Sequence, residues 1–183
     1  MVAKSKHARD NVIAETTMAT PLGPVLLEFS AKGLKNLIIA AKDDISRKDV
    51  KKSTLESPSL PDETLQKWRN QIAQALEKYF AGQPVSFEDL PLDLKGGPFH
   101  LQVWRELRKI PPGKTVSYQE LARRLGKPKA ARAVGQACGA NPIPLIVPCH
   151  RVIAANGALG GFSAGLDRKR WLLRHEKEIA EGQ

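Results

Sequence analysis

One segment of the chain, residues 82–98, separates two halves that differ in pattern, and so limits the folds open to it. Its sequence, GQPVSFEDLPLDLKGGP, is rich in proline and glycine, which interrupt helices and strands. Before it, short apolar runs separated by turn residues are followed by one helical stripe, whereas after it apolar residues recur at helical spacing in several segments. The 183 residues therefore predict two small domains, residues 1–94 and 95–183, joined by a linker.

The first half has the pattern of a small antiparallel sheet with one helix. Residues 12–18, 24–29 and 34–40 predict strands that are separated by turns. Residues 42–60 are polar and charged, and predict an exposed, mobile loop. Residues 61–80 predict a helix, and we expect the aromatic residues of its stripe to belong to the core. The stripe consists of Leu65, Trp68, Ile72, Leu76 and Tyr79.

The second half has the pattern of a helix-turn-helix motif. Residues 99–110 predict an amphipathic helix that ends before two prolines. Ser117 and Glu120 predict a capping box at the start of the next helix, which runs to about Leu125. A tight turn, GKP at residues 126–128, leads into a helix of mostly small residues at 129–139.

The charge of the chain favours a polyanionic partner, with nucleic acid first. The chain has 29 Lys and Arg against 19 Asp and Glu, which gives a net charge of +10 and a pI near 9.8. The thin helix at 129–139 can approach a nucleic-acid backbone closely, and only Arg132 and Gln136 could reach base edges. We therefore expect recognition of shape and backbone. The alternatives are a charge that serves solubility and an alanine-rich helix packed inside a bundle.

Cys149 has the surroundings of a reactive thiol. It follows Pro148, after a predicted short buried strand at Leu145–Val147, and precedes His150 and Arg151. A thiol is a nucleophile only as the thiolate, which a neighbouring base can provide. Neighbours in a strand point to opposite faces, so either Pro148 marks a turn or the histidine acts through a water.

A third group should orient His150, and three carboxylates of the helix predicted over 167–178 are candidates: Asp167, Glu176 and Glu178. The alternative for Cys149 is a buried structural cysteine. Cys138 lies in the alanine-rich helix with no base beside it, so we interpret it as packing.

Several other classes of site are disfavoured. Two Cys and four His make no recognisable zinc site, and the glycine-rich residues 156–165 lack the phosphate-loop signature. We therefore expect no metal and no cofactor. No apolar run could span a bilayer, and the basic residues 1–15 lack the apolar core of a secretory signal. We expect free thiols, a cytoplasmic protein (nuclear in a eukaryote) and no membrane partner.

Five sequence blocks of the second half form a recognisable series: VSYQELA at 116–122, ARAVGQA at 131–137, NPIPLIVPCHRVI at 141–153, GGFSAGLDRKRWLL at 160–173 and HE at 175–176. Through these blocks the second half resembles the O6-alkylguanine-DNA alkyltransferases. The order and spacing of the blocks agree with that family over residues 98–178, whereas residues 1–97 agree only in layout. The resemblance implies an α/β (α+β) fold. This fold has a small N-terminal antiparallel-sheet domain with a helix, and a mainly helical, winged-helix-like C-terminal domain with the helix-turn-helix.

The resemblance also implies DNA repair by direct damage reversal. The protein would bind duplex DNA through the minor groove and flip O6-alkylguanine, or O4-alkylthymine, out of the base stack. It would then transfer the alkyl group irreversibly to Cys149, once per molecule. We expect a monomer that is able to crowd cooperatively on DNA.

The resemblance assigns roles to individual residues. Cys149 would be the nucleophile, His150 would deprotonate it through a water, and Glu176 would orient His150. Asn141 would hold the turn between the DNA-binding helix and Cys149. Arg132 would intercalate into the stack, and Tyr118 would donate a hydrogen bond to the leaving base. Further DNA or base contacts are implied for Lys129, Ala131, Gly135, Val152, Phe162 and Ser163.

Two positions depart from the family pattern: Phe162 stands where many relatives have Tyr, and Cys138 stands where some have Met, on a pocket wall. Three other functions compete with alkyl transfer. A non-catalytic sensor of alkylated bases would lack a reactive cysteine. A transcriptional regulator would need more base contacts than residues 129–139 supply. A cysteine hydrolase would leave the basic helix-turn-helix unexplained.

Overall fold

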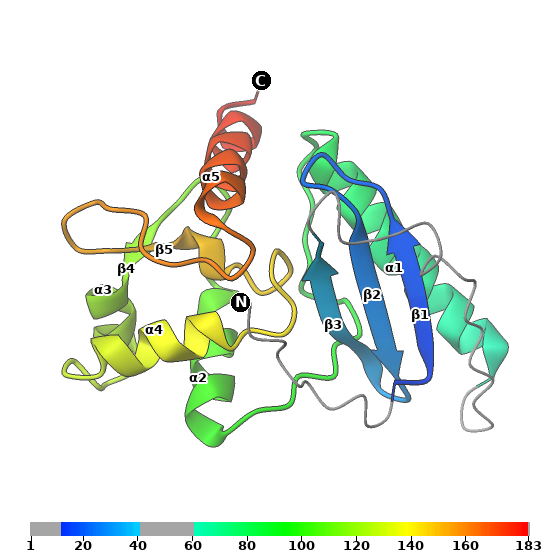
Figure 1. Cartoon of the computed structure of the whole chain (residues 1–183), viewed down its shortest axis with the longest axis horizontal. Coiled ribbons are helices and arrows are strands. Elements are labelled where there is room, and N and C mark those ends of the chain that lie inside the picture. Colours follow the sequence, from blue (N-terminus) through cyan, green and yellow to red (C-terminus); the bar gives the residue numbers. More distant parts are fainter. Residues whose placement is uncertain (1–11, 41–60, 183) are drawn as a thin grey trace, which may run out of the picture.

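The first half of the chain folds into a three-stranded antiparallel sheet covered on one face by a helix. The structure, a computed structural model, describes residues 12–40 and 61–182. The strands β1 (Ala14–Met18), β2 (Val25–Ser30) and β3 (Gly33–Ile39) lie in the order β1-β2-β3. Helix α1 (Asp62–Phe80) lies across the sheet (Figure 1). This is the arrangement predicted from the sequence, whereas the loop expected at 42–60 and most of the basic residues 1–15 lie outside the described residues.

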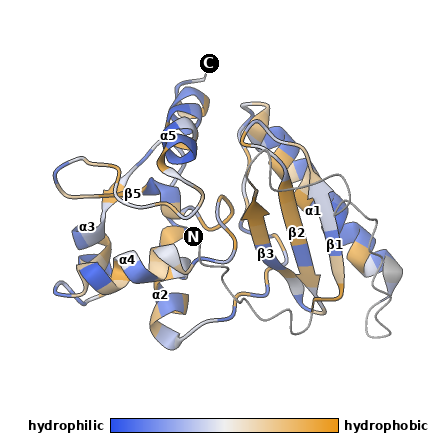
Figure 2. Ribbon diagram, viewed as in Figure 1, coloured by the Kyte–Doolittle hydropathy of each residue, from blue (hydrophilic) through white to orange (hydrophobic). Residues whose placement is uncertain are grey.

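The core of this half forms because apolar residues alternate along the central strand. Val25, Leu27 and Phe29 of β2 are fully buried. Ile72 and Leu76, from the predicted stripe of α1, are also fully buried. In Figure 2, β3 and much of β2 are orange, β1 is paler, and α1 is mixed in colour, as expected for apolar strands covered by an amphipathic helix.

The linker is hydrogen-bonded to β3 at the edge of the sheet. Leu34 of β3 forms a bridge to Leu92, with its N–H donating to the carbonyl of Pro91 at 2.8 Å. The hydroxyl of Ser30 donates to the carboxylate of Asp93 at 2.6 Å, and both side chains are buried. The contact is close, because a Cβ on Gly33 would lie 2.4 Å from the Pro91 oxygen. Position 33 therefore requires glycine.

The second half is mainly helical, as predicted. It contains α2 (Pro98–Leu107), α3 (Tyr118–Arg124), α4 (Ala131–Gly139) and α5 (Leu166–Glu181), with a 3-10 turn η1 (Cys149–Arg151) before α5. Two short strands, β4 (Val116–Ser117) and β5 (Val152–Ile153), pair in parallel and were not predicted. No helix in residues 12–40 and 61–182 is long and apolar enough to cross a membrane.

Three predictions about the helices need correction. Helix α2 ends at Leu107 and not at Ile110, because Lys109 and Ile110 donate to carbonyls three residues back in a tighter turn ahead of Pro111. Helix α4 begins at Ala131, two residues later than predicted. Ser117 accepts from the Glu120 N–H at 3.0 Å, but the Glu120 carboxylate pairs with Arg123 and Arg124 and does not complete a capping box.

The short strand predicted at Leu145–Val147 is a turn. Pro144 and Val147 form an isolated bridge, and Leu145 between them has a φ of 76°, in the left-handed region. The prolines at 142 and 144 lack the N–H groups that a strand pairing requires. The residues are nevertheless buried, as the apolar run predicted, with Leu145 only 1% exposed.

Candidate active site

Cys149 is a buried thiol at the start of a tight turn. Its residue is 5% exposed, and it opens η1 directly after Pro148. The carboxamide of Asn141 donates to its sulfur at 3.2 Å and to the carbonyl of Val147 at 2.7 Å. The Asn141 oxygen accepts from the N–H of Ile143 at 3.0 Å. One side chain thus connects the end of α4 to the loop that carries the cysteine.

His150, the residue after Cys149, forms a fully buried pair with Glu176. The 3-10 turn removes the difficulty that adjacent strand residues point to opposite faces. Nε2 of His150 lies 2.7 Å from Oε1 of Glu176 on α5, while Nδ1 is buried with no hydrogen-bond partner in the described structure. Of the three candidate carboxylates, only Glu176 reaches His150. Asp167 is exposed and pairs with Arg170, and Glu178 is half-exposed.

Glu176 also binds two residues to which the sequence analysis assigned no role in the site. Arg151 donates to its two oxygens through Nε and Nη2, each at 2.8 Å. The hydroxyl of Tyr79, which was predicted to be core, donates to Oε1 at 2.9 Å from the N-terminal half. Tyr79 is indeed buried, but it has a polar contact that helical spacing alone does not indicate.

The electrostatics of the buried groups favour a neutral thiol and a neutral imidazole at rest. Burial raises the pKa of Cys149, although the Asn141 hydrogen bond and the charge of Lys169 oppose this. Burial lowers the pKa of His150, although Glu176 opposes it. Burial alone would raise the pKa of Glu176, but His150 and Arg151 hold it well below its usual value. The result is a charged carboxylate beside an imidazole that is free to accept a proton.

Lys169 is a second charged residue of α5 that lies inside the protein. Its ammonium donates to the carbonyl of Val152 at 2.6 Å and to that of Gly161 at 3.2 Å. It therefore ties β5 to the glycine-rich loop next to Cys149. The sequence contains an indication of this burial. Lys169 lies three residues before buried Leu172 and Glu176 lies four residues after it, so all three share one face of the helix.

Tyr118 lies between the glycine-rich loop and α4, near both cysteines. A Cβ on Gly160 would lie 2.6 Å from the Tyr118 hydroxyl, and one on Gly135 of α4 would lie 3.8 Å from its ring. The ring of Phe162 contacts His150 edge-on, with centroids 6.3 Å apart. Ser163 is exposed in the same loop.

Helix α4 has one buried and one exposed face. Val134, Ala137 and Cys138 are buried, whereas Arg132 and Gln136 are exposed. Ala131 and Gly135 are partly exposed on the same helix, and Lys129 is exposed just before it. The helix is therefore not enclosed in a bundle.

Cys138, the second free cysteine, is buried on α4 near Cys149. Burial, and then Cys149, raise the pKa of Cys138 to about 12, so it remains a protonated thiol. Within the described residues, no group of three His, Cys, Asp or Glu side chains could hold a metal ion.

Comparisons with known proteins give consistent matches to both halves. A model for the ribonuclease-like domain of 6-O-methylguanine DNA methyltransferase matches residues 13–94, and a model for its DNA binding domain matches residues 98–178. The crystal structure of Mycobacterium tuberculosis OGT in complex with DNA is similar, with a TM-score of 0.74 and 40% identity. The match covers 91% of this chain and 94% of that one.

Curated relatives differ in how much of their length is matched. The methylated-DNA–protein-cysteine methyltransferase of Methanosarcina acetivorans is 42% identical over 158 residues, covering 86% of this chain and 94% of the relative. The protein of the same name from Shigella flexneri is 50% identical over 105 residues, which are 57% of this chain and 61% of that protein. The chain thus spans less than two thirds of the Shigella protein and nearly all of the archaeal one.

Proposed function

Because the chain belongs to the 6-O-methylguanine DNA methyltransferase family, we propose that it repairs DNA by moving the alkyl group of O6-alkylguanine onto its own Cys149. The observation that carries the proposal is the buried series Cys149, His150 and Glu176. In this series the His150 Nδ1 has no hydrogen-bond partner among residues 12–40 and 61–182, while Nε2 is bound to the carboxylate. This arrangement suits the removal of a proton from a neighbouring thiol.

The reaction is a displacement at the alkyl carbon. The Cys149 proton passes to Nδ1 of His150 through one water, and Glu176 stabilises the resulting imidazolium. The thiolate attacks the alkyl carbon, a carbon–sulfur bond forms and the bond to O6 breaks. The electron pair of that bond remains on guanine, to which the Tyr118 hydroxyl donates a hydrogen bond. Because a thioether has no easy route back to the thiol, each molecule acts once.

Duplex DNA is the proposed partner, because it is the form in which an alkylated guanine has to be repaired. The similar M. tuberculosis protein forms a complex with DNA in its crystal structure. The exposed face of α4 carries Arg132, which would occupy the space left by the flipped base. Lys129, Ala131 and Gly135 would approach the backbone, and Val152, Phe162 and Ser163 would border the base. We extend the substrate class to O4-alkylthymine on the resemblance alone.

The first test is intact-protein mass spectrometry after mixing with a duplex that carries one O6-methylguanine. We expect a gain of one methyl group per protein that maps to Cys149 and then stops. Cys149→Ser should gain nothing, whereas Cys138→Ser should react like the natural protein. Tight binding of the modified duplex without methyl transfer would instead support a sensor that recruits other repair factors. Repeated turnover of the duplex would contradict the proposal.

Assembly and compartment form a separate part of the proposal. We expect a monomer in solution that crowds cooperatively on longer DNA, which sedimentation velocity with and without duplex tests. Both described cysteines are free thiols, which favours a reducing compartment such as the cytoplasm or nucleus.

A further inference from the structure

Tyr79 brings the N-terminal half of the protein into contact with the proton-transfer groups. It lies at the end of α1 and is 2% exposed, and its hydroxyl donates to Oε1 of Glu176 at 2.9 Å. That same oxygen lies 2.7 Å from Nε2 of His150. Donors from both halves of the chain therefore share one carboxylate oxygen.

The position of Tyr79 is fixed by consecutive residues of α5. Nε2 of His175 lies 2.6 Å from the Tyr79 carbonyl oxygen, and the His175 ring meets the Tyr79 ring edge-on at 5.3 Å. Glu176, the next residue, accepts from the hydroxyl. The ring also contacts Phe87, with centroids 5.7 Å apart. Tyr79 is thus bound at its backbone, its ring and its hydroxyl, so its hydroxyl has little freedom to leave Glu176.

The hydroxyl serves as a donor. Burial, and then the charge of Glu176, raise the pKa of Tyr79 well above its usual value, so the hydroxyl keeps its proton. Oε1 of Glu176 accepts from Tyr79 and from Nη2 of Arg151 as well as from His150, and Oε2 accepts from Nε of Arg151. Each donor withdraws charge from the carboxylate that faces the imidazole.

We propose that Tyr79 is a positioning residue that holds Glu176 and limits the proton affinity of His150 from across the two halves of the protein. The physical reason is competition for one oxygen. A hydrogen bond from Tyr79 is strongest when Glu176 carries its full charge, that is, beside a neutral imidazole. Tyr79 therefore favours neutral His150, and its removal favours the imidazolium–thiolate pair. This inference rests on the proposed alkyl transfer to Cys149.

The other charged groups around His150 do not duplicate this role. Arg151 and Lys169 both disfavour the imidazolium by their positive charge, and Glu176 is the group that favours it. On the side of Tyr79, His175 contacts the carbonyl and the ring and not the hydroxyl. Removing the Tyr79 hydroxyl therefore changes one donor to Glu176 and no formal charge.

The test compares the pH dependence of Cys149 alkylation in the natural protein and in Tyr79→Phe. Iodoacetamide is the probe, without DNA, and peptide mapping separates Cys149 from Cys138. We expect the midpoint of the rate profile to move to lower pH by about half a unit to one unit, the equivalent of one net hydrogen bond. Ile72→Val, which removes a methyl group from the fully buried face of the same helix, is the control for a general loss of stability.

The possible outcomes separate the inference from the proposed function. A shift to lower pH in Tyr79→Phe alone supports the inference. An unchanged midpoint, a shift to higher pH, or the same shift in Ile72→Val overturns it, and thermal melting verifies that both variants are folded. A parallel reaction with O6-methylguanine duplex tests the proposed function. If that reaction fails in the natural protein while the iodoacetamide profiles differ, the alkyl transfer is wrong and the coupling of Tyr79 to His150 stands.

Discussion

At the scale of the single residue, Glu176 couples the candidate site to the stability of the protein. Its carboxylate is buried, and its folded pKa is lower than the value of about 4.3 of an unfolded chain. A lowered pKa means that the charged form contributes stability above the unfolded pKa, and that this contribution is lost as the pH falls through the folded pKa. The charge of Glu176 therefore stabilises the fold at neutral pH and ceases to do so in acid.

The substitution Glu176→Gln should lower the free energy of unfolding at pH 7 by about 3–5 kcal/mol, because it leaves the buried Arg151 without its counter-charge. Urea denaturation at several pH values measures this. The difference from the natural protein should shrink as the pH falls below about 4. Glu178→Gln on the same helix, which is half-exposed, should have little effect. A difference that does not depend on pH would contradict the assignment of the charge to Glu176.

Leu145 provides a second prediction at this scale, because its backbone is left-handed while its side chain is buried. At most positions a protein with glycine is less stable than the same protein with alanine. At position 145, however, alanine keeps a left-handed backbone strain of about 1–2 kcal/mol, which glycine relieves. Both variants lose the buried leucine side chain, but Leu145→Gly should be more stable than Leu145→Ala by about 1 kcal/mol in urea. The reverse order would show that the turn relaxes.

The residue scale also shows where prediction from sequence ends. Cys149 and His150 could be proposed from the residues around them, whereas Glu176 was one of three candidate carboxylates that only the family resemblance separated. Tyr79 could not be proposed, since its partner lies 97 residues away and its apolar spacing already explained its burial. Helical periodicity indicates a buried position for Lys169, but lysine is rarely buried, so its burial was not predicted.

At the scale of elements, the glycine-rich loop depends on one close contact. Gly160 has a φ of 67°, and a Cβ there would collide with the Tyr118 hydroxyl. We expect Gly160→Ala to displace Tyr118 and to slow methyl transfer from duplex DNA roughly ten- to hundredfold. Gly157→Ala is the matched control, because Gly157 has a φ of 83° and nothing within 4 Å of the added Cβ. Equal rates in the two variants would show that the contact between position 160 and Tyr118 is not the cause of slower methyl transfer.

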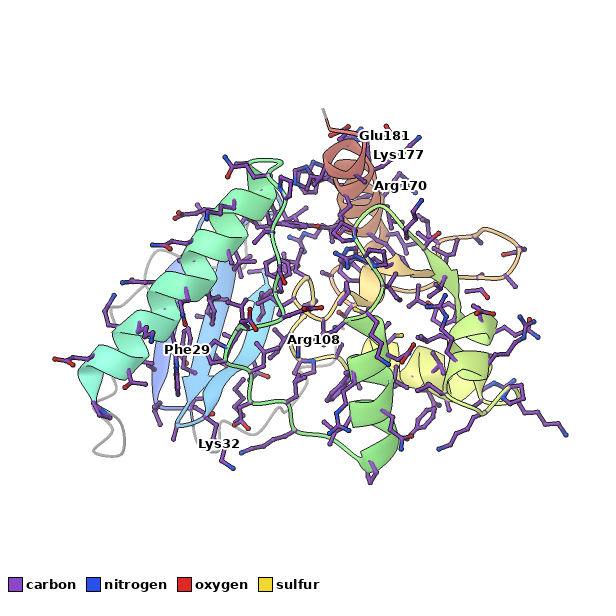
Figure 3. All side chains as sticks on the ribbon, turned by 180° about the vertical axis from the view of Figure 1, so that it is seen from behind. Phe29, Lys32, Arg108, Arg170, Lys177 and Glu181 are labelled. Carbon is purple, nitrogen blue, oxygen red and sulfur yellow. The ribbon has the colours of Figure 1, made fainter. Side chains whose placement is uncertain are left out.

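Helix α4 provides a test of base flipping. Arg132 is exposed on its outer face, so Arg132→Ala should reduce alkyl transfer from a duplex. Flipping costs a few kcal/mol, which corresponds to about ten- to hundredfold in rate. The reaction with free O6-benzylguanine should not change, because no duplex has to open. Arg170→Ala removes the same charge from the outside of α5 (Figure 3) and should leave both rates unchanged. A slower reaction with free O6-benzylguanine would show that Arg132 acts where the base binds and not through base flipping.

Elements were predicted where the local pattern was long. The three strands of the sheet and helix α1 follow from alternation and helical spacing over five or more residues. Strands β4 and β5 contain two residues each, too few for a period to be visible. The segment at Leu145–Val147 was misjudged because an apolar run indicates burial and not conformation, and the φ of Leu145 was not readable from its residue type.

At the scale of the whole molecule, the proposed alkyl transfer should change the stability of the protein. Cys149 is 5% exposed and bonded to Asn141, so an added methyl group enters a packed space. Overpacking of this kind costs about 1–3 kcal/mol, or about 2–10 °C in melting temperature for a chain of this size. Calorimetry before and after reaction with O6-methylguanine duplex measures it, with Cys149→Ser as the control. An unchanged or higher melting temperature would contradict tight packing around the sulfur.

The two halves are joined by Arg168 of α5 as well as by Tyr79. The guanidinium of Arg168 donates to the carbonyls of Leu22 and Ile39 in the first half and of Ala164 in the second. It also donates to the carbonyl of Ala40. Near this contact, the N–H of Leu37 on β3 donates to the carbonyl of Pro142, beside the loop that carries Cys149. Figure 1 shows β3 as the strand nearest the second half.

These contacts bear on how such a protein can diverge. Backbone carbonyls present the same acceptor whatever side chain they carry, so the sheet can drift in sequence while Arg168 keeps its partners. The hydroxyl of Tyr79 has no such substitute. A chimaera that takes its first half from a distant relative should therefore tolerate wide change in the strands. The pH profile of its Cys149 alkylation should differ from that of the natural protein unless the introduced half has a tyrosine at the position of Tyr79.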